Sequence, residues 1–563
     1  LADDAVVAEV KLADMGETWA CFDGLSVLVT RQSALDRLPA ASLDALARWV
    51  NGGGRIVLAA DSPSDTWRRF APPGVRMSDP RTVSPPSSLT RLLAFGEVSA
   101  PSLLARTLSI GGDAELRGWS ASEHVADGSL IARGPCGGGI AVITAFDPAL
   151  ASCFLSDSAV NPLWVALLKA ALPDRPQGAP ASSEFHYGYI VSSGDGAVGA
   201  AALRAAVDAL CDVPPVPAWV YVVIVLFSVL LSLLVGLGDY IVLGRLKARH
   251  RSWVTAGAWI ATFGLVAWAL PNVLRREETT LGRVTVVDAL PARAPANAPS
   301  ARWRSGVTAV FAAATTSAPL TAATPGPTEI DGFWRGVSVL AEYDYGRRSS
   351  QSAPTTELAI VQRVSALDAG AAAAVPPARG LELRQWTLRT LHDVGPAQRT
   401  PAIAYAPDGR DGEFSVAGLP PDATVRSAAV QTSRGWAALS QQPGVRRGEL
   451  LLKGGLTFSR TLNGWHQPEG DGRAVYAGYY RDERAPADGR TYLELDGARR
   501  RTAAFDALAA GGNFAVVHLL VEGPGEITTP IPHRARAVTL YRVAVPLVQP
   551  APPDEAPQNP ATP

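Results

Sequence analysis

The amino-acid sequence predicts a multidomain protein in which a two-helix transmembrane hairpin lies between an α/β (flavodoxin-like) domain and a β-sandwich-like C-terminal region. Three observations support this fold class. A strand–helix–strand pattern fills residues 25–60, two long uncharged apolar segments occupy 216–238 and 253–271, and short alternating strands follow residue 271. The chain of 563 residues is long enough for several such parts. The expected divisions are an α/β domain (1–175), a connector with a short helix (176–215), transmembrane helix 1 (216–246), a basic loop (247–252), transmembrane helix 2 (253–271), a β-rich region of one or two sandwich lobes (272–547) and a disordered Pro/Ala tail (548–563).

The α/β domain is predicted from alternating strand and helix signals near the N-terminus. Leu25–Thr30 is rich in β-forming residues, and a helix is expected from Ser42, a residue type favoured at helix N-caps. Gly52–Gly54 would end that helix before a second strand at Arg55–Ala60. A strand–helix–strand unit of this kind predicts a parallel sheet.

Two further elements are expected before residue 175. Ser129–Arg133 and Ile140–Phe146 flank the sequence GPCGGG and predict a β-hairpin. Asn161 and Pro162 then predict the start of a helix, because asparagine suits the cap and proline the first turn.

The two apolar segments predict membrane helices. Val216–Gly238 and Trp253–Pro271 carry no charge over about 23 and 19 residues. At ~1.5 Å per residue each can cross a hydrocarbon core of ~30 Å. Short cationic loops stay in the cytoplasm, so both large parts are expected outside the cytoplasm of a bacterial cell, anchored in its inner membrane. The alternative is a buried helical hairpin of a soluble protein.

Several residues are candidates for the membrane interface. Asp239 and Tyr240 at the end of the first apolar segment, and Trp253 at the start of the second, suit interfacial anchors, and Arg245 or Arg249 would pair with Asp239. The alternative for Asp239 is an ion or proton pathway, which would require oligomers or partners. The cations Arg245, Lys247, Arg249 and Arg251 are expected to set the orientation and to contact anionic lipid.

The four cysteines Cys21, Cys136, Cys153 and Cys211 all precede the first apolar segment. An oxidising periplasm permits a Cys136–Cys153 disulfide, and four buried free thiols are the alternative. Because the chain opens with Leu-Ala-Asp-Asp, a signal or anchor segment is expected to have been removed, or the chain trimmed.

The β-rich region is predicted from short alternating segments separated by Gly, Pro and Asp turns. Scattered tryptophans accompany them, and Ala371–Arg379 is a loop or a boundary between two lobes. The expected strands are Gly282–Ala289, Ser305–Ala313, Gly336–Tyr343, Thr356–Val364, Leu381–Leu391, Ala474–Tyr480, Asn513–Gly523 and Ala537–Val545.

Three stretches carry a resemblance to a known group of proteins: Leu43–Ala60, Gly137–Ala151 and the junction Gly236–Thr255. With this order of elements the chain resembles a group of functionally uncharacterised bacterial membrane proteins. These have a class I glutamine-amidotransferase-like N-terminal domain, a transmembrane hairpin and a β-rich C-terminal region. The junction resembles a Gly-Pro-x-Asp-Tyr pattern, in which Leu237 replaces the expected proline.

Catalysis of that amidotransferase type would need a cysteine nucleophile at a strand-to-helix turn, activated by a histidine. Residues 134–138 match G-x-C-x-G around Cys136, but a β-forming run follows, so no helix N-terminus lowers the pKa of the thiol. His124 and His186, which precede the apolar segments, lack the His-x-Glu spacing. A glycine-rich β-turn is the preferred interpretation.

Motifs for cofactors and metals are weak. Residues 194–199 match G-x-G-x-x-G, but no second strand follows to supply a ribose-binding acid, so a helix-capping turn is preferred. None of the seven histidines pairs with another ligand at the spacing of a zinc site. They are His124, His186, His250, His392, His466, His518 and His533.

The sequence therefore predicts no catalytic, cofactor or metal site. A net charge of −1 gives no reason to expect nucleic acid as a partner. The expected function is a non-enzymatic, membrane-anchored scaffold or binding subunit of a bacterial envelope complex, with the lipid bilayer and membrane or envelope proteins as partners. The alternatives are an extracytoplasmic hydrolase or amidotransferase-like enzyme whose site lies on loops, and an accessory subunit of a transporter.

Overall fold

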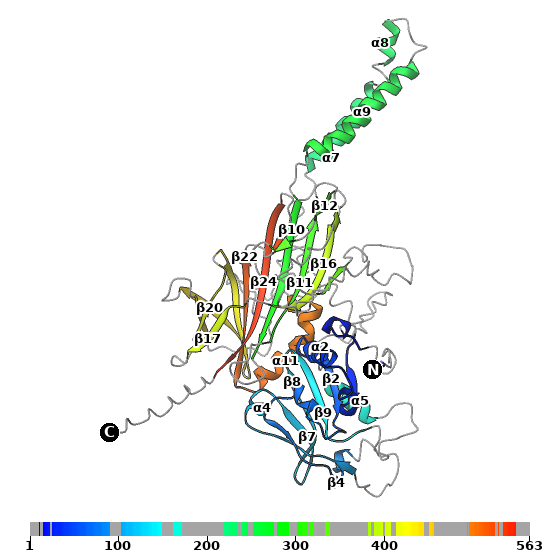
Figure 1. Ribbon diagram of the computed structural model, residues 1–563. Coiled ribbons are helices and arrows are strands. Elements are labelled where there is room, and N and C mark those ends of the chain that lie inside the picture. The colour runs from blue at the N-terminus through cyan, green and yellow to red at the C-terminus, as the bar shows by residue number, and fades with distance from the viewer. Residues whose placement is uncertain are drawn as a thin grey trace, which may run out of the picture.

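The structure is a computed structural model of the whole chain. Its described residues are 11, 15–22, 25–89, 103–148, 162–171, 218–234, 236, 239–245, 252–274, 279–291, 301–312, 316–318, 321–322, 333–337, 381–383, 388–397, 400–406, 413–420, 422–443, 450–454, 492–493, 495–523, 527–528 and 533–547. They form an α/β unit, a helical hairpin and a large β sheet, and the α/β unit and the hairpin lie at opposite ends of that sheet (Figure 1).

The α/β unit is built on a seven-stranded mixed sheet of order β1-β2-β9-β8-β6-β3, with β7 paired to β8. β1, β2 and β9 are parallel, and β8 and β9 form the predicted antiparallel hairpin. Its main elements are β1 (Leu28–Arg31), α1 (Gln32–Leu35), α2 (Ala40–Asn51), β2 (Arg55–Ala59), β3 (Val75–Met77), β6 (Leu108–Ile110), α4 (Asp113–Leu116), β7 (Ser120–Val125), β8 (Gly128–Cys136), β9 (Gly139–Thr144) and α5 (Pro162–Ala171), with 3-10 turns η2 (Trp19–Phe22) and η3 (Thr66–Arg69) and a small ladder of β4 (Arg81–Val83) and β5 (Leu103–Ala105).

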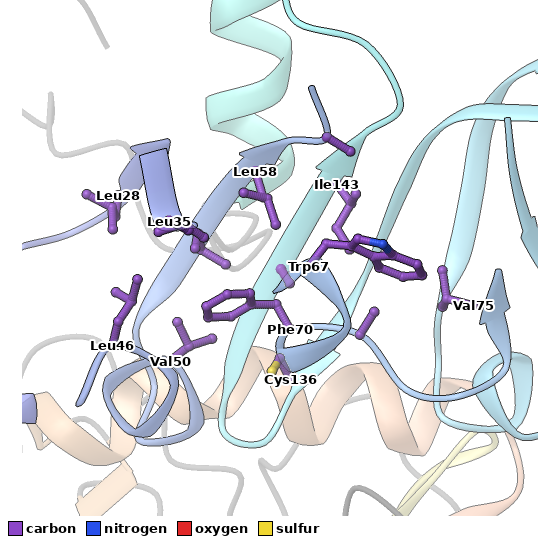
Figure 2. Packing of buried hydrophobic residues seen from close by; sticks show 14 of the residues in the cluster. Leu28, Leu35, Leu46, Val50, Leu58, Trp67, Phe70, Val75, Cys136 and Ile143 are labelled. Carbon is purple, nitrogen blue, oxygen red and sulfur yellow. The ribbon is translucent and has the colours of Figure 1, made fainter. Parts of the chain in front are cut away.

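Helices cover both faces of this sheet, which explains why its central strands are apolar throughout. On β2, Ile56 and Leu58 belong to the core under α2, whereas Val57 belongs to the core under α5, because successive side chains of a strand point to opposite faces. Figure 2 shows the first core, to which Leu46 and Val50 of α2, Leu58 of β2 and Phe70 all contribute. The predicted strand–helix–strand unit is thus confirmed.

One local prediction for α2 is wrong. The helix begins at Ala40, with Pro39 at the N-cap position, rather than at Ser42. Ser42 is buried within the first turn, and its hydroxyl donates a hydrogen bond to the carbonyl oxygen of Met15 at 3.3 Å. The serine therefore holds the N-terminal segment against the helix instead of capping it.

The C-terminal part is built on one 11-stranded sheet of order β14-β16-β11-β10-β24-β22-β19-β20-β21-β18-β17. All neighbours are antiparallel except β10 and β24, which pair in parallel. The strands are β10 (Thr279–Leu290), β11 (Ala301–Phe311), β14 (Phe333–Val337), β16 (Leu388–Pro396), β17 (Ala402–Ala406), β18 (Glu413–Ala417), β19 (Thr424–Thr432), β20 (Gly435–Pro443), β21 (Leu450–Gly454), β22 (Phe514–Gly523) and β24 (His533–Pro546). Two short ladders join β12 (Thr316–Ala318) to β15 (Leu381–Leu383) and β13 (Thr321–Ala322) to β23 (Ile527–Thr528).

The prediction of a β-rich C-terminal region is confirmed, but the structure has one large sheet where a β-sandwich was expected. The sheet curls so that β17 approaches β24, and the helix α11 (Asp496–Ala510) packs on its face. Ala498 of α11 lies in one core with Val284 and Val307, and Phe505 lies in another with Phe514 and Val516. A helix therefore covers part of the face that a second sheet covers in a sandwich.

The hairpin consists of α7 (Ala218–Leu233), α8 (Asp239–Arg245) and α9 (Ser252–Leu274). α7 and α8 lie within the predicted helix over 216–246, and residues 235, 237 and 238 between them lie outside the described part of the chain. Phe227 of α7 packs on Phe263 of α9, with ring centroids 4.5 Å apart. Within the described part of the chain, none of the helices combines the length and the apolar character that a membrane crossing requires.

Several predictions lie outside the described residues. These are the connector helix near 198–210, the motif at 194–199, Cys153 and Cys211, the cations Lys247, Arg249 and Arg251, the histidines His186, His250 and His466, the expected strands Thr356–Val364 and Ala474–Tyr480, and the tail over 548–563.

Candidate functional site at the joint between the two units

The α/β unit meets the large sheet through two glycine turns, which together with α11 and the start of β11 form what we call the joint. The first turn, Gly52–Gly54, follows α2, and the second, Gly137–Gly139, links β8 to β9. A Cβ atom on Gly52 would lie 2.8 Å from the ring of Trp303, and one on Gly138 would lie 2.7 Å from Cγ of Arg501. Gly52 and Gly138 therefore need to be glycine, because a side chain there would push β11 or α11 away.

Trp303 is the main apolar contact of the joint. It lies near the start of β11, is 6% exposed, and meets Trp19 of η2 edge to face with ring centroids 5.1 Å apart. Aromatic pairs in this geometry contribute about 0.5–1.5 kcal/mol beyond the area they bury. The N-terminal 3-10 turn thus contacts the sheet directly.

A buried charge cluster lies beneath this contact. Asp288 of β10 accepts hydrogen bonds from Arg501 of α11 and from Arg542 of β24, with Arg542 Nη2 at 2.8 Å from Oδ2. Burial alone would raise the pKa of Asp288, but the charges of Arg542 and Arg501 and their hydrogen bonds outweigh it and hold that pKa below its usual value. The carboxylate is therefore ionised at neutral pH and holds α11 on the sheet.

Arg501 extends this cluster to the α/β unit. Its Nη2 donates to the hydroxyl of Ser305 at 2.9 Å, and its Nη1 donates to the carbonyl oxygen of Gly52 at 3.3 Å. One fully buried guanidinium thus joins β10, β11, α11 and the first glycine turn. Such a cation is stable in the interior only when its donors are satisfied, so its position is tightly specified.

A second buried cluster lies one strand further. Asp393 of β16 bonds the two Nη atoms of Arg283 at 2.9 and 3.1 Å and Nε of Arg304 at 3.0 Å. Burial again raises the pKa of Asp393, and the two guanidinium groups more than offset it. The cluster fixes the mutual register of β10, β11 and β16, because buried ion pairs tolerate little displacement.

A cavity of about 250 Å³ opens beside the joint. Both units contribute to its wall, which includes Arg48, Asn51, Cys136, Arg117, Trp303 and Leu508. The thiol of Cys136 is 3.7 Å from Oδ1 of Asn51, and the residue is 4% exposed. The described residues of the wall include no histidine and no carboxylate.

The sequence-based interpretation of Cys136 as part of a β-turn is confirmed. Cys136 is the last residue of β8, and β9 begins at Gly139, so a strand rather than a helix follows it. Cys136 carries a free thiol, and Cys153, the partner considered for a disulfide, lies outside the described residues. The sequence did not indicate that this turn lies against α11.

The other predicted residues do not gather at one place. Tyr240 and Trp253 are exposed at 65% and 76% on α8 and α9, Arg245 is exposed in the last turn of α8, and Asp239 is the first residue of α8. His124 bonds the hydroxyl of Ser129 at 2.8 Å, and His518 packs on Trp436. Among the described residues no group of three or more His, Cys, Asp and Glu is arranged to hold a metal ion.

The second glycine turn gives a test of close packing. Gly137 and Gly112 have nearly the same backbone, with φ of +59° and +57°, but a Cβ on Gly137 would lie 2.6 Å from Oδ1 of Asn51 whereas one on Gly112 meets nothing within 4 Å. We expect Gly137→Ala to lower the free energy of unfolding by about 1–3 kcal/mol more than Gly112→Ala. Urea titrations of both variants measure this, and equal losses would contradict the steric explanation.

Comparisons with known proteins give no relative from which to transfer a function. No protein-family model matches the chain, and no curated protein matches it. Among solved structures, the yeast delta-COP-I mu-homology domain covers 48% of this chain and 98% of its own length at 10% identity, with a TM-score of 0.20. The same domain complexed with a Dsl1 WxWxV peptide covers 47% and 98%, with the same identity and TM-score. These likenesses carry no argument about this chain.

Proposed function

We propose that this chain is a non-enzymatic, membrane-anchored scaffold or binding subunit of a bacterial envelope complex. In this proposal the hairpin α7–α9 inserts in the inner membrane, and the α/β unit, a degenerate amidotransferase-like domain, and the large sheet act as one body outside the cytoplasm. The observation that carries the proposal is the exposed apolar surface of the hairpin.

Most exposed large apolar side chains of the described residues belong to the hairpin. On α7 they recur every three or four residues, so they form a continuous stripe along the helix. A lipid bilayer is the occupant that fits, because the exposed aromatic residues Tyr240 and Trp253 and the cation Arg245 lie where the hairpin turns, as at a membrane–water interface. The stripe consists of Val222, Val225, Leu226, Val229, Leu230 and Leu233.

The joint supports a scaffold in which both units move together. Arg501 donates to a carbonyl of the α/β unit while it is held by Asp288 of the sheet, and Trp303 packs against Gly52. The cavity beside Cys136 offers no described histidine or carboxylate to act as a general base. We therefore favour a binding role over hydrolysis at this cysteine.

Vesicle flotation of the full chain tests the membrane anchor. We expect the double variant Leu226→Arg/Leu265→Arg to reduce the fraction that floats with phosphatidylethanolamine–phosphatidylglycerol vesicles at least tenfold. Each arginine placed in a membrane helix costs about 3 kcal/mol. Leu104→Arg is the matched control, because Leu104 of the α/β unit is 70% exposed, compared with 68% for Leu226 and 66% for Leu265.

Two results would contradict the proposal. If the double variant and the control float like the parent chain, the hairpin does not anchor the protein. If the purified chain hydrolyses glutamine or another amide and Cys136→Ala abolishes that activity, the protein is an enzyme and the scaffold role is wrong.

A further inference from the structure

The cavity at the joint has the composition of a small-molecule site. The cations Arg48 of α2 and Arg117, which follows α4, lie in its wall together with the amide of Asn51, while Phe70, Trp303 and Leu508 supply apolar surface. The described wall contains no carboxylate. A few polar groups on an otherwise apolar wall are typical of ligand sites that fix the orientation of one charged end.

Arg48 is the group best placed to meet a ligand. It lies in the last turn of α2 and is exposed, and its guanidinium makes no hydrogen bond or ion pair with another described residue. A guanidinium binds a carboxylate through two parallel hydrogen bonds, which neutral groups cannot reproduce. An anion therefore gains a charge-assisted contact here without displacing an existing ion pair of Arg48.

We propose that this cavity binds a small organic carboxylate, with the carboxylate at Arg48 and Asn51 and an apolar body against Trp303 and Leu508. The volume of about 250 Å³ lies just below the ~300–1,000 Å³ usual for ligand pockets, so the ligand is small. This inference is independent of the membrane anchor, because every residue it uses belongs to the two units at the joint.

Occupancy of the cavity has a structural consequence. The wall takes residues from α2 and the β8–β9 turn on one side, and from β11 and α11 on the other. A ligand that contacts both sides binds only when the joint is closed, so it stabilises the closed joint by mass action. The site would make closure of the joint responsive to a small carboxylate.

Calorimetric titration of the full chain in detergent tests the proposal with three probes of one shape: 3-phenylpropionate, 3-phenylpropionamide and 3-phenylpropylamine. We expect the acid to bind at least tenfold more tightly than the neutral amide, and the amine not to bind. Arg48→Ala and Asn51→Leu should each weaken the acid at least tenfold and leave the affinity for the amide unchanged. Arg37→Ala is the control, because Arg37 is exposed in the same unit and does not line the cavity.

Arg48→Lys should recover part of the affinity, since lysine restores the charge but not the paired hydrogen bonds. Thermal unfolding without ligand checks that each variant is folded, and the surface position of Arg48 favours that result. The proposal is overturned if the acid shows no saturable binding at millimolar concentrations. It is also overturned if acid and amide bind alike, or if Arg37→Ala weakens binding as much as Arg48→Ala.

Discussion

Replacing Asp288 by alanine is expected to lower the free energy of unfolding by about 3–5 kcal/mol, because it leaves the buried cations Arg501 and Arg542 without their counter-ion. Both guanidinium groups are at most 1% exposed, so water cannot take the place of the carboxylate. The same change removes the group that holds Arg501 toward the carbonyl of Gly52. Denaturant titration measures the loss, and hydrogen exchange at the turn Gly52–Gly54 should rise in parallel.

A surface ion pair provides the matched control for Asp288. Asp44 pairs with Arg69, and both side chains are about half exposed, so Asp44→Ala is expected to cost no more than about 1 kcal/mol. The triple variant Asp288→Leu/Arg501→Met/Arg542→Met should recover much of the stability lost in Asp288→Ala, because it removes the unpaired cations. A loss for Asp288→Ala as small as that of Asp44→Ala would show that water reaches the cluster.

Acidification is expected to destabilise the large sheet through His518. Burial is the main cause that lowers the pKa of His518 to about 3, and the charge of Arg542 adds to it, while Asp288 acts in the opposite direction. The unfolded chain takes up a proton near pH 6.5 and the folded chain does not, so stability falls as the pH drops below 6.5, by about 1.4 kcal/mol per pH unit until the folded pKa is reached. Between pH 6.5 and 5 this amounts to about 2 kcal/mol.

His518→Phe isolates this effect, because it keeps an aromatic ring against Trp436 and removes the titrating group. The difference in unfolding free energy between the parent chain and this variant should change by about 1.4 kcal/mol per pH unit between pH 6.5 and 5, which corresponds to one proton. Parallel pH profiles for the parent and His518→Phe would mean that His518 takes up its proton at the same pH in the folded and the unfolded chain.

Local elements of the fold were predictable from the sequence. The strand–helix–strand unit, the β8–β9 hairpin and the helix beginning at Pro162 were each identified from a few neighbouring residues, and all are confirmed. Glycine stops, β-forming runs and caps act over one or two turns of chain, so they can be recognised locally. The start of α2 was misplaced for the same reason, since the partner of Ser42 is distant in sequence.

The pairing of distant strands was not predictable. Alternation shows which side of a strand faces a core, but it does not say which strand is its neighbour. Nothing in the local sequence therefore indicated that β10 pairs in parallel with β24, or that the strands form a single large sheet. The helix α11 was also missed. Its apolar positions Ala498, Phe505, Leu508 and Ala509 have helical spacing, but consecutive arginines obscure the pattern.

The candidate site was predictable only in part, because local sequence patterns do not show which distant segments pack together. Cys136 and its glycines were correctly placed in a β-turn, but a turn does not reveal what will pack on it. Asp288 and Arg501 each look like ordinary charged residues in the sequence. Their burial follows from tertiary contacts between segments 213 residues apart, which no periodicity records.

The hydrogen bond from Arg501 to Gly52 joins residues 449 positions apart, and this sets the order in which the protein can be completed during synthesis. The α/β unit leaves the ribosome first and must keep its glycine turns uncovered until α11 has been made. A nascent chain that stops before residue 495 lacks α11, β22 and β24, so β10 has no parallel neighbour and Trp303 has no helix beside it. The joint can therefore close only after α11, near the end of the chain, has been made.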